Sequence, residues 1–469
     1  MSRLLLTLVV VFVLATPPAL AEAPVAPSAE ISYHRDIKPI FRAKCFGCHQ
    51  PAKQGGELDM TRFAAMLAGG ESGEPSIVPG KPDASYLVDL ITPSGDRAPE
   101  MPQKGDPLTA SDIDRVRRWI AAGAEDDSPA EDEQQITADK PPVYQKAPVV
   151  TSLDFSPDGA MIAVSGYHEV LLHAADGGEL LGRLVGLSER IESAVFSPDG
   201  KQLAVTGGSP GRLGELQIWD VDKRVLTLSV PVTYDTIYGA SWSPNGKLVA
   251  FGCGDHTLRA VDAESGEQVL FQGAHNDWVF DTVFSKEGTH LVSVSRDRSM
   301  KLTEVATARF IDNITSITPG ALKGGLHAVD RHPTADQLLI GGADGVPKIY
   351  RMFREKDRKI GDDFNLIRAF PALPGRIFAA EFNHDGSQIV AGSSQDGAGV
   401  VRVYNAADGK QIAELEGIEG GVYTATFSPD GKRIASGGFS GEVFLNDAAT
   451  GKLISKFIPV PLAGQEQDE

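Results

Sequence analysis

The residues best suited to chemistry in this chain are two cysteines and a histidine in the run Cys45-Phe46-Gly47-Cys48-His49. Two thiols three positions apart, followed at once by an imidazole, have the spacing at which haem is attached covalently in c-type cytochromes. Cys45 and Cys48 would form thioethers to the haem vinyl groups, and His49 would bind one face of the iron as its proximal ligand. The motif therefore predicts a redox centre with one covalent haem c.

Two other interpretations of the cysteine pair have requirements of their own. A zinc site needs two more Cys or His ligands at matched spacing, and the one other cysteine, Cys253, lies far away in a different kind of sequence. A thioredoxin-like dithiol needs no histidine, and no βαβ pattern surrounds this segment. Covalent haem is the interpretation that uses all three residues.

The N-terminal segment predicts export, which agrees with haem attachment outside the cytoplasm. Residues 1–21 contain a basic Arg3, an apolar run Leu4–Ala15 and a small-residue cleavage site at Pro17–Ala21. About a dozen apolar residues ended by two prolines are short for a membrane span. We expect a signal peptide at residues 1–21, a periplasmic or otherwise exported mature chain, and no transmembrane segment after cleavage.

Two short helices are expected to position the motif. Apolar residues at helical spacing predict a helix over Tyr33–Lys44 that delivers Cys45, with its regular part beginning at Pro39. A second helix follows Thr109, which can cap it, and ends at Gly123. Crossing of the two helices, with Trp119 at the contact, is the arrangement of a small all-α monohaem cytochrome c.

The sixth position of the iron needs a second donor, and the loop before the second helix offers Met101 between two prolines. Restricted loop freedom reduces the entropy lost when the sulfur is held on the iron. Met60, Met66, His34 and an open sixth site are the alternatives, although Met66 falls in a segment expected to be helical, where methionine more often packs in a core. A histidine and methionine pair would raise the reduction potential and leave no open site for substrate, which favours electron transfer.

The segment around the motif resembles the Planctomycete-type cytochrome c domain over about ninety residues. The matching segments are Phe41–His49, Gly55–Asp59, Gly69–Gly73, Ile77–Pro82, Met101-Pro102 and Trp119–Ala124. The resemblance implies a monohaem domain joined to varied partner domains, with haem attached to Cys45 and Cys48, proximal ligation by His49 and distal ligation by Met101. One departure is Gln103, which replaces the second of two prolines that commonly follow the family's methionine.

Composition divides the remainder of the chain. We expect a cytochrome domain at residues 30–126, an acidic linker at 127–142 that lacks aromatic residues, and a third unit at 143–460. If haem uses two thiols, one of the 3 cysteines remains and no disulfide framework within the chain is possible. The net charge of −19 argues against nucleic acid and anionic membrane surfaces as partners.

The third unit repeats one pattern seven times: an alternating strand, a Pro-Asp-Gly type turn and a second strand, followed by two further strands. The repeated segments are Leu153–Gly159, Ala194–Gly200, Ala240–Gly246, Thr282–Gly288, Val329–Ala335, Ala380–Gly386 and Ala425–Gly431. Four short strands in each of seven repeats predict an all-β seven-bladed β-propeller. The charged stretch between Tyr350 and Phe370 is expected to be a surface insertion.

The repeats resemble the WD-repeat family, with Trp219-Asp220 as a literal match to its signature. His275, Ser293 and Asp297 correspond to that family's buried hydrogen-bonded positions, so we interpret them as structural residues and expect no haem or metal role for them. Cys253, on the second strand of its repeat, is expected to be a buried small apolar residue. The unit therefore offers no metal constellation and no second haem motif.

These observations favour a periplasmic electron carrier whose propeller docks a redox partner protein. They favour an electron-transfer protein over an enzyme. A second hypothesis is an oxidoreductase whose propeller oxidises a small molecule and passes electrons to the haem domain of the same chain. A third is a haem-containing sensor or scaffold. An enzyme would need a cofactor or metal retained by the propeller, which a spectrum and metal analysis of the purified protein would detect.

Overall fold

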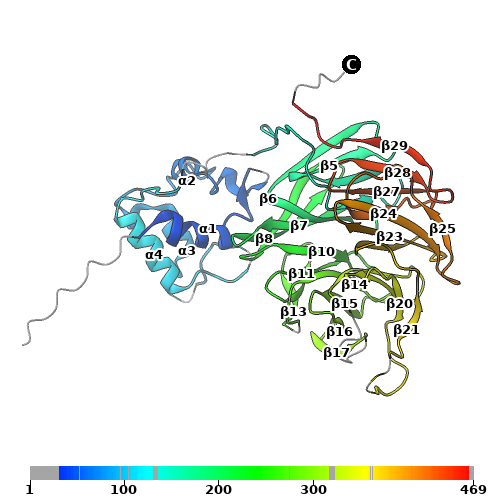
Figure 1. The fold of residues 1–469 in the computed structure, drawn as a ribbon. Coiled ribbons are helices and arrows are strands. Elements are labelled where there is room, and N and C mark those ends of the chain that lie inside the picture. Colours follow the sequence, from blue (N-terminus) through cyan, green and yellow to red (C-terminus); the bar gives the residue numbers. More distant parts are fainter. Residues whose placement is uncertain are drawn as a thin grey trace, which may run out of the picture.

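The computed structural model describes residues 31–51, 53–95, 97–103, 105–129, 136–273, 275–315, 323–359, 361 and 363–463. The expected signal peptide at residues 1–21 lies outside this part of the chain. A small helical region at one side and a larger region of strands at the other make up the molecule (Figure 1). Among the described residues, no helix is long and apolar enough to span a membrane.

The helical region consists of short elements joined by loops. Its elements are η1 (Tyr33–Ile37), α1 (Lys38–Lys44), β1 (His49–Gln50), β2 (Lys53–Gln54), η2 (Gly55–Glu57), α2 (Phe63–Ala68), η3 (Pro82–Ala84), α3 (Tyr86–Ile91) and α4 (Ala110–Ala121). β1 and β2 pair as a two-stranded antiparallel sheet. The four α-helices lie together on the side of the molecule away from most of the strands (Figure 1).

Both expected helices are present. The first is divided into a π-helical turn, η1, and the regular helix α1, in which Pro39 occupies the first turn, where its missing N–H removes no helical hydrogen bond. Thr109 caps α4 by accepting a hydrogen bond from the Asp112 N–H at 3.1 Å. Gly123, with φ of +115°, follows the helix end in a conformation that favours glycine.

The helices meet at Trp119, as the sequence predicts. Its ring stacks on Tyr33 at 5.3 Å between centroids and meets the edge of Phe41 at 6.2 Å. The Trp119 indole N–H donates to the Glu125 carbonyl at 3.0 Å, so the first acidic residues after α4 fold back on the helical region. Asp127, the first residue of the expected linker, accepts a hydrogen bond from the His34 N–H at 2.8 Å.

The strand region consists of antiparallel sheets formed by strands that follow one another in the chain. Its strands are β3 (Leu153–Phe155), β4 (Met161–Ser165), β5 (Tyr167–Ala174), β6 (Leu180–Phe196), β7 (Gln202–Ser209), β8 (Leu213–Asp220), β9 (Val225–Thr233), β10 (Ile237–Trp242), β11 (Leu248–Cys253), β12 (Leu258–Asp262), β13 (Gln268–Gln272), β14 (Val279–Phe284), β15 (His290–Ser295), β16 (Met300–Glu304), β17 (Arg309–Asn313), β18 (Leu326–Arg331), β19 (Gln337–Gly342), β20 (Lys348–Arg351), β21 (Leu366–Ala369), β22 (Arg376–Phe382), β23 (Gln388–Gln395), β24 (Ala398–Asn405), β25 (Gln411–Glu414), β26 (Val422–Phe427), β27 (Arg433–Gly438), β28 (Val443–Asp447) and β29 (Leu453–Phe457).

The expected four strands per repeat are present in five sheets, which begin at β10, β14, β18, β22 and β26. The first two repeats differ, because the long strand β6 ends one repeat and begins the next, joining β3 to β9 in one seven-stranded sheet. The first strand of each four-stranded sheet contacts the first strand of the next, β6 contacts β10, and β26 contacts β3.

Turn chemistry explains why each repeat starts with a hairpin. In the first repeat the Ser156 hydroxyl donates to Asp158 at 2.5 Å and accepts the Met161 N–H at 2.9 Å, while Gly159 adopts a φ of +71°. Equivalent Ser-to-Asp or Ser-to-Asn bonds occur in three further turns, at Ser197, Ser243 and Ser428. The recurring Ser-Pro-Asp-Gly sequence is therefore a turn signal with a defined hydrogen-bond pattern.

Candidate haem-attachment site

The cysteine pair lies in a tight turn at the end of α1. The Cys45 N–H donates to the Phe41 carbonyl at 2.7 Å and ends the helix. The N–H groups of Cys48 and His49 then both donate to the Cys45 carbonyl, at 3.1 and 3.0 Å. These bonds wrap the five residues of the motif around one carbonyl and place both thiols and the imidazole in the same turn.

Both cysteines of the motif are free thiols, and they differ in exposure. Cys45 is partly buried against the hydrophobic core of the helical region, whereas Cys48 is exposed. Burial, with a smaller contribution from Cys48, raises the pKa of Cys45 to about 12. Cys45 is therefore a protonated thiol, and the pair is not joined in a disulfide.

The ring of His49 is oriented by the backbone. Its Nδ1 lies 2.8 Å from the Gly55 carbonyl oxygen. A carbonyl can only accept a hydrogen bond, so Nδ1 carries the proton and the lone pair remains on Nε2. Burial lowers the pKa of His49, partly offset by hydrogen bonds to the backbone of Gly55 and Leu58, so the ring is neutral at pH 7. A neutral imidazole whose N–H is held by a backbone carbonyl is the state in which histidine binds metals.

The four candidates for the second iron ligand occupy different environments. Met60 and Met66 are almost fully buried in the core of the helical region. His34 is exposed on η1. Met101 is partly buried against the same core as Cys45, and its N–H donates to the Leu90 carbonyl at 3.0 Å. Among these four, Met101 is thus a sulfur donor at the boundary between core and solvent.

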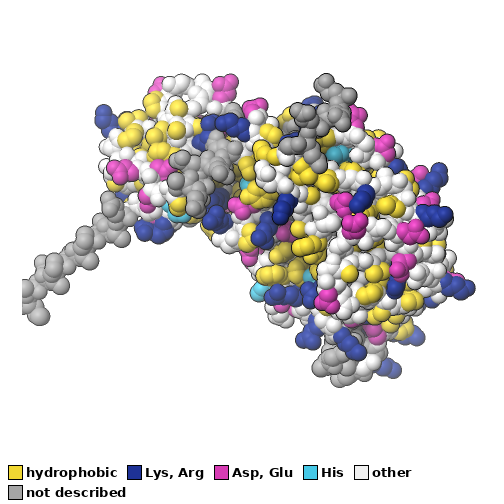
Figure 2. Space-filling view, turned by 45° about the horizontal axis from the view of Figure 1, so that its top comes forward, with side chains coloured by type: hydrophobic (Ala, Val, Ile, Leu, Met, Phe, Trp, Pro, Cys, Tyr) yellow, Lys and Arg dark blue, Asp and Glu magenta, His cyan; other side chains and the backbone are white. Residues whose placement is uncertain are grey.

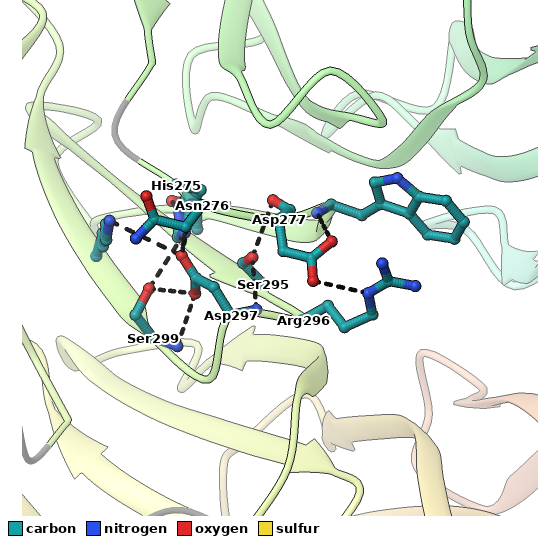
Figure 3. A network of polar contacts seen from close by, with 10 residues as sticks. His275, Asn276, Asp277, Ser295, Arg296, Asp297 and Ser299 are labelled. Atoms are coloured by element: carbon teal, nitrogen blue, oxygen red, sulfur yellow. Dashed lines mark hydrogen bonds and ion pairs between the residues drawn. The ribbon is translucent and has the colours of Figure 1, made fainter. Parts of the chain in front are cut away.

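In the strand region, the residues expected to be structural form one buried network (Figure 3). His275 Nδ1 lies 3.1 Å from Asp297 and its Nε2 lies 2.7 Å from the Ser293 hydroxyl. Burial alone would raise the pKa of Asp297. Hydrogen bonds from His275, Ser299 and the Asn276 N–H instead hold this pKa below its usual range. The network ties the segment before β14 to the turn between β15 and β16, which is a structural role.

Sequence reasoning missed two groups of buried acids. Glu215 on β8 is 1% exposed and touches the helical region through Gln50. Asp154, Asp281 and Asp330 each accept an N–H from the backbone of the following repeat, at 2.7 to 2.9 Å. The available signal was that Asp154 and Asp330 occupy equivalent positions of different first strands, each two residues before the residue that opens the turn, whereas Asp281 lies four residues before Ser285. Within the described residues, no three His, Cys, Asp or Glu side chains are grouped so as to hold a metal ion. Cys253 is buried on β11, as expected.

Comparisons with known proteins divide the chain in the same way. Residues 45–105 match the family model for Planctomycete cytochrome C. Residues 143–170, 223–262, 266–303 and 409–447 match the model for the WD domain, G-beta repeat. Residues 45–105 are therefore similar to the cytochrome C domain of the Planctomycete type, and the strand region is similar to WD repeats, so we call it the WD-repeat region from here on.

Curated relatives resemble this chain as WD-repeat proteins. Eukaryotic translation initiation factor 3 subunit I of Aspergillus terreus is 27% identical over 207 residues, which are 41% of this chain and 59% of that protein. Periodic tryptophan protein 2 of Arabidopsis thaliana is 22% identical over 374 residues, which are 78% of this chain and 39% of that protein. The chain thus spans about two fifths to three fifths of the length of these relatives.

Proposed function

We propose that this protein is an exported monohaem c-type cytochrome that transfers single electrons. The observation that carries the proposal is the combination of two free thiols in the turn after α1 with a neutral His49, whose Nδ1 proton is held by the Gly55 carbonyl. The match of residues 45–105 to the Planctomycete cytochrome C family supports it.

The residues of the turn fit a covalently attached haem. Each thiol would add its S–H across one vinyl group, forming a C–S and a C–H bond without an oxidant. His49 would supply the proximal nitrogen through Nε2, and Met101 the distal sulfur. Haem bound in this way supplies one-electron redox chemistry. With His49 and Met101 both supplied to the iron, this chain would hold the two ligands and limit solvent access, as an electron carrier requires.

We further propose that the WD-repeat region is a seven-bladed β-propeller, with β6 shared between the first two blades. Contacts between successive first strands, continued by β26 against β3, support this arrangement. The two ends of the region also meet, because the Val150 N–H donates to Gly438 and the Ala463 N–H to Tyr144, at 3.0 and 2.8 Å. In this proposal the cytochrome domain covers residues 30–126, the linker 127–142 and the propeller 143–460.

The propeller would serve as a platform for a redox partner protein. Tyr234 and Phe439 are 64% and 63% exposed, and lie in connections at the end of the sheets where the first strands begin. Exposed aromatic side chains are common anchors of protein interfaces. Charges of both signs alternate over the visible face of the region, which favours a protein surface over a polyanion (Figure 2).

The experiment that tests the proposal is replacement of both motif cysteines, with Cys253 as the matched control. In the C45S/C48S double variant, the haem-stained band that survives denaturing electrophoresis should disappear, because no thiol remains to form a thioether. The Cys253→Ser variant should keep the band. A haem band retained by the double variant would refute covalent attachment at this motif.

A further inference from the structure

The turn that carries the cysteines is pressed against the WD-repeat region. A Cβ atom placed on Gly47 would lie 2.6 Å from the Ser229 carbonyl oxygen and 3.1 Å from Pro231 Cδ, so no larger residue fits between the turn and β9. Lys53 Nζ donates to the Thr227 carbonyl of the same strand at 2.7 Å. Leu187 of β6 packs against the core of the helical region. The two regions therefore share a packed interface at the motif itself.

At the centre of this interface is the carboxyl group of Glu215. The hydroxyl of Ser188 and the amide nitrogen of Gln217 each donate to its Oε2, at 2.8 Å, and the Ser229 hydroxyl donates to its Oε1. The side chain of Gln50, from the helical region, also acts on this carboxyl group, because it lowers the pKa of Glu215 against the larger, opposite effect of burial. The groups that lower the pKa of this carboxyl group against burial are all neutral side chains. Burying it against neutral donors alone is costly unless all of them are held in place.

Gln50 links this carboxyl group to the haem-attachment turn. It follows His49 directly, is 0% exposed, and its Nε2 donates to the Phe46 carbonyl inside the motif at 3.1 Å. The Gln50 side chain thus bonds to the backbone of the turn and acts on an acid of the other region. β1, which contains His49 and Gln50, is only two residues long, and the side chain of Gln50 adds to the backbone hydrogen bonds that hold this segment.

We propose that Glu215 is a positioning residue for the haem site, which it reaches from the WD-repeat region through Gln50. By holding Gln50, Glu215 fixes the Cys45–His49 turn and, with it, the plane of the His49 ring. The WD-repeat region is then part of the redox centre, because one of its side chains sets the geometry of the proximal ligand. This inference rests on the proposed function, since it assigns His49 to the iron.

The test is a double-mutant cycle on the full-length haem-loaded chain with Glu215→Ala, Gln50→Ala and the double variant. Its readouts are the midpoint potential, the electron paramagnetic resonance g-values, which report the orientation of axial ligands, and amide hydrogen exchange of the peptide containing Cys45–Gln50. Glu381→Ala is the matched control, because Glu381 is an equally buried acid on β22 that accepts the Phe427 N–H at 3.1 Å.

We expect each single variant to change the equilibrium constant of haem reduction by at least about threefold and to speed exchange in the motif peptide, and the double variant to add little. Glu381→Ala should leave all three readouts unchanged. Additive effects of Glu215→Ala and Gln50→Ala, or wild-type values in a folded Glu215→Ala chain, would overturn the proposal. If Glu215→Ala does not fold, the same criteria apply to the shape-conserving Glu215→Gln.

Failure of the proposed function would give a different result. A wild-type chain without covalent haem would refute haem attachment, whereas hydrogen exchange would still report whether Glu215 holds the turn. Covalent haem with unchanged exchange, potential and g-values in the Glu215 variants would refute only the role of Glu215.

Discussion

The two regions of this molecule use histidine in the same tautomer for different purposes. His275 donates from Nδ1 to Asp297, and its Nε2 lone pair accepts the Ser293 hydroxyl proton. His49 also carries its proton on Nδ1, but it donates to the backbone carbonyl of Gly55. In the WD-repeat region both nitrogens are committed to protein side chains that join two segments. In the helical region the backbone fixes the ring and leaves a neutral nitrogen suited to a metal.

The largest difference between the two histidines should appear when each is removed. His49→Ala takes away the proposed proximal ligand, so the low-spin absorption and paramagnetic resonance spectra of the haem should be lost, while thermal unfolding of the WD-repeat region stays unchanged. His275→Ala should leave the haem spectra intact. Absorption spectroscopy and calorimetry of the two variants measure both effects. Equal haem spectra in wild type and His49→Ala would contradict the assignment of His49 to the iron.

Met101→Ala should have the next largest effect on the haem. Loss of the thioether sulfur removes a ligand that favours ferrous iron, so the midpoint potential should fall and the weak near-infrared sulfur-to-iron band should vanish. Met66→Ala, which removes a methionine buried in the same core, is the control and should destabilise the fold by about 2–5 kcal/mol with the band retained. Retention of the band in Met101→Ala would transfer the distal role to the thioether of Met60, whereas a wild-type chain without the band would point to His34.

His275→Ala should act on the stability of the WD-repeat region. Removing the imidazole leaves the carboxylate of Asp297, whose side chain is 8% exposed, without its buried partner. We expect a loss of about 2–4 kcal/mol in the unfolding free energy of the WD-repeat region. Denaturant titration followed by tryptophan fluorescence measures it. A loss below about 0.5 kcal/mol would mean that this network does not join the two segments.

The buried acids of the first strands predict a dependence on pH. Burial raises the pKa of Asp154 to about 7, although N–H groups of Phe196 and Phe155 favour the charged form. Since the unfolded value is about 3.9, the folded state binds the proton more tightly, and stability is lost as pH rises from about 4 to about 7. Relative to wild type, Asp154→Asn should therefore gain about 1.4 kcal/mol per pH unit within this window. Denaturant unfolding at pH 5 and pH 8 tests it, and an equal difference at both values would contradict the raised pKa.

The smallest effect concerns the cap of α4. Thr109→Ala removes the acceptor of the Asp112 N–H and should cost about 1 kcal/mol in the stability of the helical region. Thr109→Ser keeps the hydroxyl and should restore most of it. Haem absorbance followed during thermal unfolding reports this region alone. The same melting temperature in the Ala and Ser variants would show that the cap is energetically silent.

Local signals explain what could be predicted from the sequence. The cap at Thr109, the apolar face of α4 and the Ser-Pro-Asp-Gly turns act within a few residues, so pattern and structure agree. The run from Gly186 to Glu189 contains no such turn; it stays extended as part of β6, and Leu187 packs on the helical core. Because β6 belongs to both of the first two repeats, the two four-stranded sheets expected there form one sheet of seven strands.

Contacts between distant residues explain what could not be predicted. Glu215 and Gln50 are far apart in the chain, and nothing in the residues around Glu215 distinguishes it from an exposed acid on a strand. Its burial is a property of the interface, because the helical region covers β8 and β9 only when both regions are folded. The same reasoning applies to Asp154, whose partner is the backbone of the next repeat and not a side chain with a recognisable motif.

The most direct test of the account is the haem content of the purified wild-type chain after extraction with acidified organic solvent. Non-covalent haem is removed by this treatment, whereas haem joined through Cys45 and Cys48 stays with the protein. We predict one haem per chain in the protein fraction, with the absorption of a doubly thioether-linked haem. Haem recovered in the solvent, or a protein fraction without haem, would contradict the central claim.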